Sequence, residues 1–124
     1  MENKRELDRR QLHRYPHILD TDDELFGYLG NISYQGMLLI AYQPIEAEEQ
    51  RQFSIQLPAH MPFHQPILPV SIEARWFKPY DESHDFYRIG CQFLNLPPIA
   101  EKLITEMQSL LGFAPGFNPG QIEE

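Results

Sequence analysis

Apolar and polar residues alternate with a period of two along much of the chain, which is typical of half-buried strands. Three segments show this alternation: residues 53–57, 70–77 and 86–93. Residues 36–42 form a short, continuous apolar run after a turn signal, and residues 25–33 predict a strand weakened by Gly27 and Gly30. Turn-forming clusters separate these runs. Several short strands at this spacing predict a mainly β protein, an antiparallel barrel or sandwich.

Trp76 is the only tryptophan of the chain. Strict alternation places it on the same face as Val70, Ile72 and Ala74, which predicts a core position. The alternative is a stacking surface for a base.

One helix is expected near the C-terminus, with Pro98 in its first turn and Gly112 just past its end. Its apolar face is expected to pack on the barrel. That face contains Ile99, Leu103, Met107 and Leu110. Residues 113–124 are rich in Pro and Gly and are expected to form a mobile tail. The alternative is that Phe113 and Phe117 anchor this tail to the body or to a partner.

Composition narrows the class of protein. A chain of 124 residues with 42% hydrophobic content is expected to form one folded domain. No apolar run is long enough for a membrane helix, and the N-terminus lacks the apolar region of a secretory signal. The single cysteine, Cys91, fits a cytoplasmic protein and is expected to be a buried small hydrophobe.

Charge is distributed unevenly. The formal net charge is -8, but residues 1–14 hold five Lys or Arg against three Asp or Glu, a local +2, so the remainder carries -10. A basic patch on an acidic body suggests a small anionic ligand, because a long polyanion would also meet the repulsive body. Taken alone, this N-terminus could equally be a solvated arm.

The segment GNISYQG, residues 30–36, lies where one expected strand turns into the next. A period of two places Asn31 and Ser33 on the same face. Gly36 suits a tight turn or the close approach of a ligand. Taken alone, the segment is also compatible with an ordinary hairpin turn.

Together, two motifs resemble the PilZ domain family, whose signature is RxxxR followed by [D/N]xSxxG. The first is Arg10-x-x-x-Arg14 and the second is Asn31-x-Ser33-x-x-Gly36. The segments ARWFK and RIGCQFLNL also resemble the family's fifth strand and the strand before its C-terminal helix. The resemblance covers roughly residues 9–111.

The resemblance implies a six-stranded antiparallel barrel with a C-terminal helix, and the bacterial second messenger cyclic di-GMP as ligand. It implies that Arg10 and Arg14 bind guanine and phosphate, with Arg9 as a helper. It also implies that Asn31 and Ser33 face a guanine and its phosphate, and that Gly36 lets the backbone approach. Arginine suits these roles, since its planar fork matches both the guanine edge and phosphate oxygens.

Other function classes have weaker support. Five histidines invite an enzyme, but neither an HExxH motif nor a cysteine cluster is present, so no metal site, catalytic residue or cofactor is expected. Binding to bulk nucleic acid is disfavoured by the acidic balance. The main alternative is a PilZ-like protein-interaction adaptor that does not bind nucleotide.

The sequence therefore predicts a cytoplasmic cyclic di-GMP receptor without membrane insertion. Residues 1–112 form the PilZ domain, residues 1–13 of it a flexible basic arm, and residues 113–124 the tail. Ordering of the arm on ligand binding is expected to signal to an unidentified downstream protein.

Overall fold

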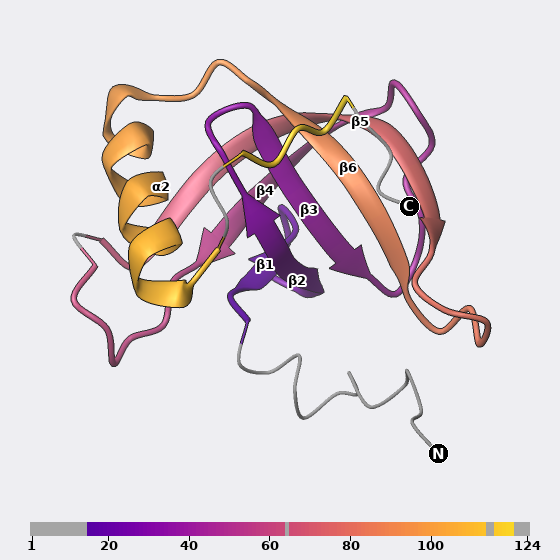
Figure 1. The fold of residues 1–124 in the computed structure, drawn as a ribbon, viewed down its shortest axis with the longest axis horizontal. Helices are drawn as coiled ribbons and strands as arrows, with labels where there is room; N and C mark the ends of the chain where they lie inside the picture. Colours follow the sequence, from indigo (N-terminus) through magenta and orange to yellow (C-terminus); the bar gives the residue numbers. More distant parts are fainter. Residues whose placement is uncertain (1–14, 64, 114–115, 121–124) are drawn as a thin grey trace.

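The computed structural model describes residues 15–63, 65–113 and 116–120. Six antiparallel strands form a closed barrel in the order β1-β2-β3-β6-β5-β4 (Figure 1). The strands are β1 His17–Leu19, β2 Leu25–Ile32, β3 Gly36–Ala41, β4 Gln50–Gln56, β5 Ile67–Pro79 and β6 Tyr87–Leu94. The mainly β barrel expected from the sequence is thus confirmed.

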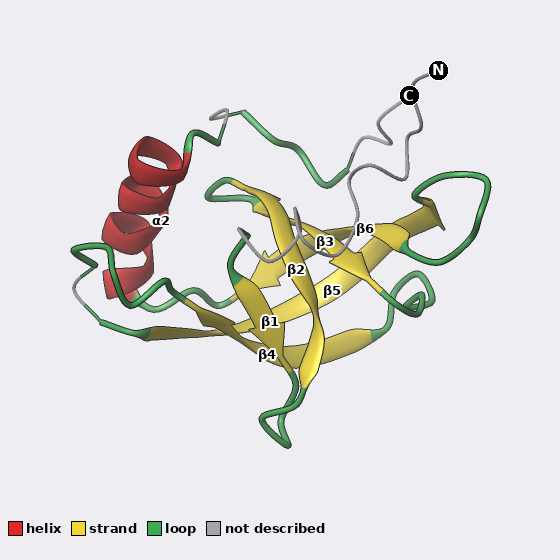
Figure 2. Cartoon of the chain, turned by 90° about the horizontal axis from the view of Figure 1, so that it is seen from below, coloured by secondary structure: helices red, strands yellow, loops and turns green. Residues whose placement is uncertain are grey.

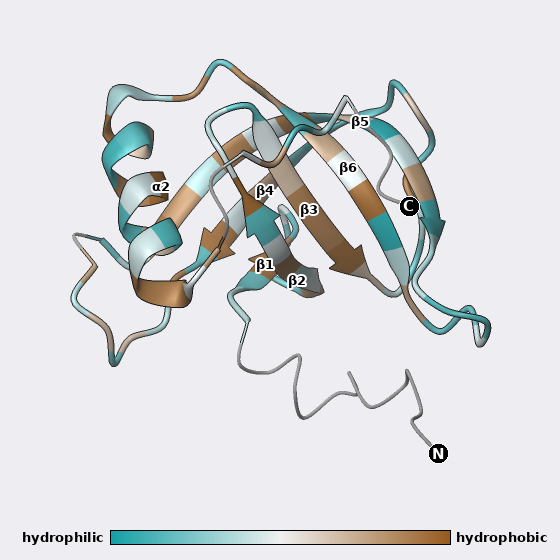
Figure 3. Cartoon of the chain, viewed as in Figure 1, coloured by the Kyte–Doolittle hydropathy of each residue, from teal (hydrophilic) through white to brown (hydrophobic). Residues whose placement is uncertain are grey.

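Alternation along the strands produces the barrel's core. In β5, Leu68, Val70 and Ile72 are buried, whereas Pro69 is exposed and Ser71 is half-buried. Figure 3 shows hydrophobic and hydrophilic positions following one another along β5 and β6. Burial of one apolar face per strand drives closure, since it removes that surface from water.

Besides a register shift between Ile18 and Leu19, where β1 pairs with β2, two β-bulges interrupt this alternation. In β2 the register shifts between Leu29 and Asn31, and in β5 it shifts between Ala74 and Trp76. Each bulge adds one residue to a strand, so the following side chains change face. The inserted residues are Gly30 and Arg75.

The bulge in β5 corrects the prediction for Trp76. Ala74 belongs to the main core, but Trp76 packs in a separate cluster with Leu38 and Phe117. Trp76 lies over Gly90, where an added Cβ would be 2.4 Å from the indole ring. Trp76 is therefore buried on the outer wall of the barrel, not on the face that Val70 and Ile72 share.

The C-terminal helix, α2 Pro98–Leu111, lies against one end of the barrel (Figure 2). Gly112 follows it in the left-handed conformation, as expected. The buried face differs from the expected one, because Ile99 and Leu110 are exposed. The buried residues are Ala100, Leu103, Ile104 and Met107. No helix in the described ranges is long and apolar enough to cross a membrane.

Residues 116–120, here called the C-terminal segment, differ from the expected mobile tail. They run along the barrel wall beside β3 and β6, drawn in yellow in Figure 1. Phe117 is buried and anchors them, which was the alternative drawn from the sequence.

Candidate functional site

The motif GNISYQG forms the β2–β3 hairpin. The Ser33 amide donates a hydrogen bond to the Gly36 carbonyl (2.9 Å), which closes the turn. The Ser33 hydroxyl accepts a bond from the Gln35 amide (3.2 Å). Short side-chain-to-backbone bonds of this kind fix turns that contain serine. The structure therefore brings Ser33 and Gly36 together, as the motif predicts.

Gly36 sits where the backbone of β3 meets that of β6. A Cβ built on it would lie 2.0 Å from the Cys91 carbonyl oxygen and 2.7 Å from Cγ of Pro119. No side chain fits such contacts, so the position requires glycine. The chain itself approaches Gly36 closely, while the approach of a ligand to this glycine stays a prediction.

Asn31, unlike Ser33 and Gly36, lines a cavity of about 430 Å³. Its side-chain oxygen, Oδ1, accepts a hydrogen bond from the Ile32 backbone amide (2.8 Å). The cavity is lined by Tyr15, Pro16, Gly30, Asn31, Leu111, Gly112 and Phe113. None of these lining residues is charged, so a bound anion would need cations from elsewhere in the chain.

Tyr15 fixes the point where the N-terminal arm joins the barrel. It is partly buried against an outer cluster built on Tyr28 and Ile40, which also includes Tyr80 and Phe86. Burial raises the pKa of Tyr80, and the neighbouring Tyr15 raises it further. Asp81 also raises this pKa, whereas Arg88 lowers it, so the Tyr80 phenol keeps its proton more firmly than a solvated tyrosine does.

Arg9, Arg10 and Arg14 lie outside the described residues. Arg14 immediately precedes Tyr15, which lines the cavity beside Asn31. The covalent chain thus brings the second arginine of the RxxxR motif to within one residue of the cavity wall.

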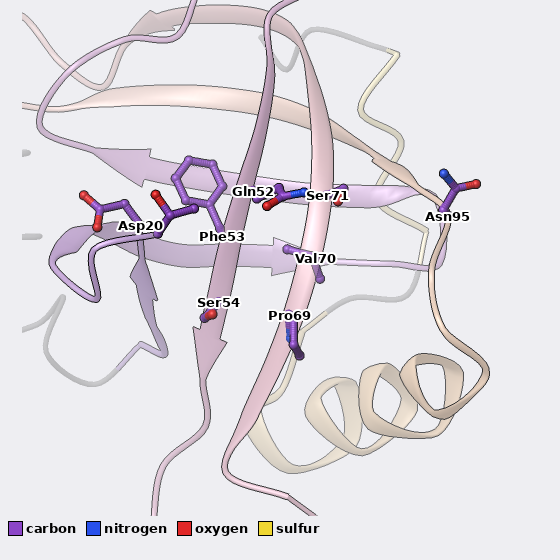
Figure 4. Close-up of a pocket in the computed structure, with 9 residues that line it drawn as sticks. Asp20, Gln52, Phe53, Ser54, Pro69, Val70, Ser71 and Asn95 are labelled. Carbon is purple, nitrogen blue, oxygen red and sulfur yellow. The ribbon is translucent and has the colours of Figure 1, made fainter.

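Two further cavities suit a dianion less well. One of about 280 Å³ lies at β4 and β5, lined by residues that include Gln52, Ser71 and Asn95 (Figure 4). Its one ionisable lining group is the Asp20 carboxylate, which would repel phosphate. The other, of about 770 Å³, shares Tyr15 and Pro16 with the cavity beside Asn31 and includes His17 and His60, but no residue of the NxSxxG motif lines it. Of these three cavities, only the one beside α2 is lined by Asn31.

Catalytic chemistry finds little support among the described residues. Cys91 is fully buried, and burial raises the pKa of its thiol to about 12, so it is not a nucleophile at neutral pH. Within the described ranges, no three His, Cys, Asp or Glu side chains are grouped so that they could hold a metal ion.

Sequence reasoning offered Phe117 as an alternative anchor of the tail, but it did not place Phe117 on the Ser33 motif or Trp76 beside it. The Ser33 hydroxyl donates to the Phe117 carbonyl oxygen (2.6 Å), and the Trp76 indole N–H donates to the Pro119 carbonyl oxygen (2.9 Å). An aromatic residue between prolines and glycines was the signal for Phe117. No signal could place Trp76 there, because its position depends on the bulge.

A protein-family model of the PilZ domain matches residues 3–108. The chain belongs to the PilZ domain family. No curated protein and no solved structure matches the chain significantly. The match spans the arm, all six strands and most of α2, and thus includes both motifs.

PilZ domains are receptor or adaptor domains, not enzymes, and the PilZ domain is generally a cyclic di-GMP-binding domain. In this PilZ domain, the hairpin with Ser33 and Gly36 and the cavity beside Asn31 are the described part of the candidate site. Partner proteins are implied by the family, without an identity.

Proposed function

We propose that this PilZ domain is a receptor for cyclic di-GMP in the bacterial cytoplasm. Arg10 and Arg14 bind guanine and phosphate, assisted by Arg9. Asn31 and Ser33 contact a guanine and its phosphate, and Gly36 lets the ligand approach the backbone. The observation that carries this proposal is the cavity between Tyr15 and Asn31, because Asn31 of the second motif lines it together with Tyr15, the residue after Arg14 in the sequence.

The charges of the site support a ligand of this kind. The cavity walls contribute no charge, so the arginines of the arm supply the positive charge for two phosphates. An arginine fork bonds phosphate oxygens and the guanine edge, and its plane also stacks on bases. Aromatic rings at the cavity, Tyr15 and Phe113, offer further apolar surface to a base.

The signal is the ordering of residues 1–14. Ordering costs about 1–2 kcal/mol per fixed residue, so ligand contacts must offset it. Once ordered, the arm presents a new surface to a downstream protein. Slower amide exchange in residues 1–14 with ligand is the expected sign of this step, and equal exchange would contradict it.

Calorimetric titration with cyclic di-GMP tests the proposal, with GTP and GMP as controls. We expect micromolar or tighter binding, about -8 kcal/mol, selective over both controls. Arg10→Ala and Arg14→Ala should each weaken binding by at least about 2 kcal/mol, or roughly 30-fold. Arg5→Ala removes the same charge from the arm outside the motif and should bind almost like the wild type.

One observation favours a second candidate, an adaptor that does not bind nucleotide. The Ser33 hydroxyl is already bonded to the C-terminal segment, so this motif residue has a partner within the chain. Absence of heat with cyclic di-GMP, together with unchanged amide spectra, would make the adaptor the better description.

A further inference from the structure

The C-terminal segment is held to the barrel by two hydrogen bonds to its backbone. Ser33 Oγ donates to the Phe117 carbonyl oxygen (2.6 Å), and Trp76 Nε1 donates to the Pro119 carbonyl oxygen (2.9 Å). The two acceptors are two residues apart. In the same segment, Phe117 and Pro119 are buried, whereas Gly116, Asn118 and Gly120 are exposed. Phe117 and Pro119 of the segment therefore face the barrel, while its other described residues face solvent.

Apolar contacts add to these bonds. The Phe117 side chain is only 6% exposed and packs with Leu38 and Trp76 on the outer wall. Pro119 covers Gly36, so closely that any Cβ there would collide with it. Burial of the Phe117 ring stabilises this contact, because it removes apolar surface from water.

This segment uses the residues that the NxSxxG motif offers to a ligand. A serine hydroxyl has one proton to donate. While that proton is donated to the Phe117 carbonyl oxygen, it is not available to a phosphate oxygen. Pro119 also packs against Gly36, beside the Cys91 carbonyl oxygen, and so takes space that a ligand at this glycine would need. A ligand that contacts both Ser33 and Gly36 therefore cannot bind while the segment is in place.

We infer that the C-terminal segment is an intramolecular competitor of the nucleotide: residues 116–120 and cyclic di-GMP exclude one another at Ser33 and Gly36. This inference rests on the proposed function. The apparent association constant is then the intrinsic constant multiplied by the fraction of molecules in which the segment is open. Binding of the nucleotide releases Phe117 and uncovers Leu38 and Trp76, so both ends of the chain change on binding.

Substitutions in the full chain test the competition by calorimetric titration with cyclic di-GMP. Phe117→Ala removes the buried anchor and should tighten binding about fivefold or more, because less of the protein is closed. Pro119→Ala is a milder change at the second contact and should act in the same direction. Asn118→Ala is the matched control, since this exposed side chain bonds only to the nearby Gly120 amide in the described contacts.

The single tryptophan provides a second readout. Its indole N–H gives one proton resonance, and its bond to the Pro119 carbonyl reports whether the segment is closed. Phe117→Ala should expose this proton to solvent exchange without ligand. In the wild type, saturating cyclic di-GMP should do the same and should move the Asn118 and Gly120 amide resonances to the positions seen in Phe117→Ala.

The outcomes separate this inference from the proposed function. Wild-type binding with tighter binding by Phe117→Ala, or binding by Phe117→Ala alone, supports the inference. A second outcome is that Phe117→Ala, Pro119→Ala and the wild type bind cyclic di-GMP with equal affinity, and that the Asn118 and Gly120 resonances of the wild type do not move. This outcome overturns the inference but keeps the proposed receptor function. If the wild type, Phe117→Ala and Pro119→Ala all fail to bind, the inference and the proposed receptor function are both overturned.

Discussion

Gly36 lies directly against the backbone of β6, so this motif position leaves no room for a side chain. An added Cβ would meet the Cys91 carbonyl oxygen, which belongs to the backbone and has little freedom to move. We expect Gly36→Ala to lower the free energy of unfolding by about 1–3 kcal/mol, as overpacking does. Urea denaturation would measure this loss.

The same substitution at Gly116 serves as the control, because a Cβ there would meet nothing within 4 Å. Gly116→Ala should unfold at the wild-type urea concentration within error. If the two alanine variants were equally stable, the assigned contact at Gly36 would be wrong.

Cys91 makes stability depend on pH in alkaline solution. Burial raises the pKa of its thiol from 9.0 to about 12, so the folded protein holds this proton more tightly than the unfolded chain. The stabilisation is complete below about pH 9 and is lost as the pH rises toward 12, with a slope of up to about 1.4 kcal/mol per pH unit.

Cys91→Ala lacks this titration and isolates its effect from those of tyrosine and lysine. Between about pH 8 and pH 10.5, the free energy of unfolding should fall more steeply for the wild type than for the variant. Parallel slopes would show that the thiol is not protected in the folded state.

At the scale of elements, α2 packs on the barrel through one face, and this face provides its contribution to stability. Leu103 is fully buried at the end of the barrel, whereas Leu110 is 43% exposed. Leu103→Ala should cost about 2–5 kcal/mol, and Leu110→Ala about 1 kcal/mol or less, although the chemical change is the same. Chemical denaturation of both variants checks this, and equal losses would place the helix on a different face.

The strands and the helix could be predicted from periodicity, but the bulges could not. The alternation in β5 continues through Ala74, and nothing in the local pattern shows that Arg75 is an inserted residue. Register is set by pairing with a distant strand, here β6. For this reason Trp76 was assigned to the wrong face, while its burial was expected correctly.

Prediction of the site divides in a similar way. The hairpin with Ser33 and Gly36 follows from local turn chemistry and was predicted. Coverage of this hairpin by Phe117 was not, because the contact joins residues 84 positions apart in the sequence. Arg9, Arg10 and Arg14 stay predictions, since they lie outside the described part of the chain.

At the scale of the whole molecule, charge restricts the ligand. The chain carries -8 overall, and the positive excess is confined to the first 14 residues. A compact dianion can bind at the arm without meeting the acidic body, but a polyanion cannot. A single-stranded RNA of about 20 nucleotides should therefore neither bind at about 0.15 M salt nor compete with cyclic di-GMP.

Fluorescence anisotropy with labelled RNA measures this directly, and Arg14→Ala is the comparison. We expect no change in anisotropy for either protein. RNA binding that Arg14→Ala abolishes would mean that the arm serves nucleic acid, contrary to the role proposed for it.

The shortest strand also closes the barrel. β1 has three residues, and it pairs with β2 on one side and with β4 on the other. Local unfolding is easiest where few hydrogen bonds hold a strand, so we expect the barrel to open most readily at β1. Arg14 lies three residues before it. A ligand that immobilises Arg14 would therefore make local opening of the barrel at β1 less frequent. The neighbouring strand β4 would then move less, without a change in its structure.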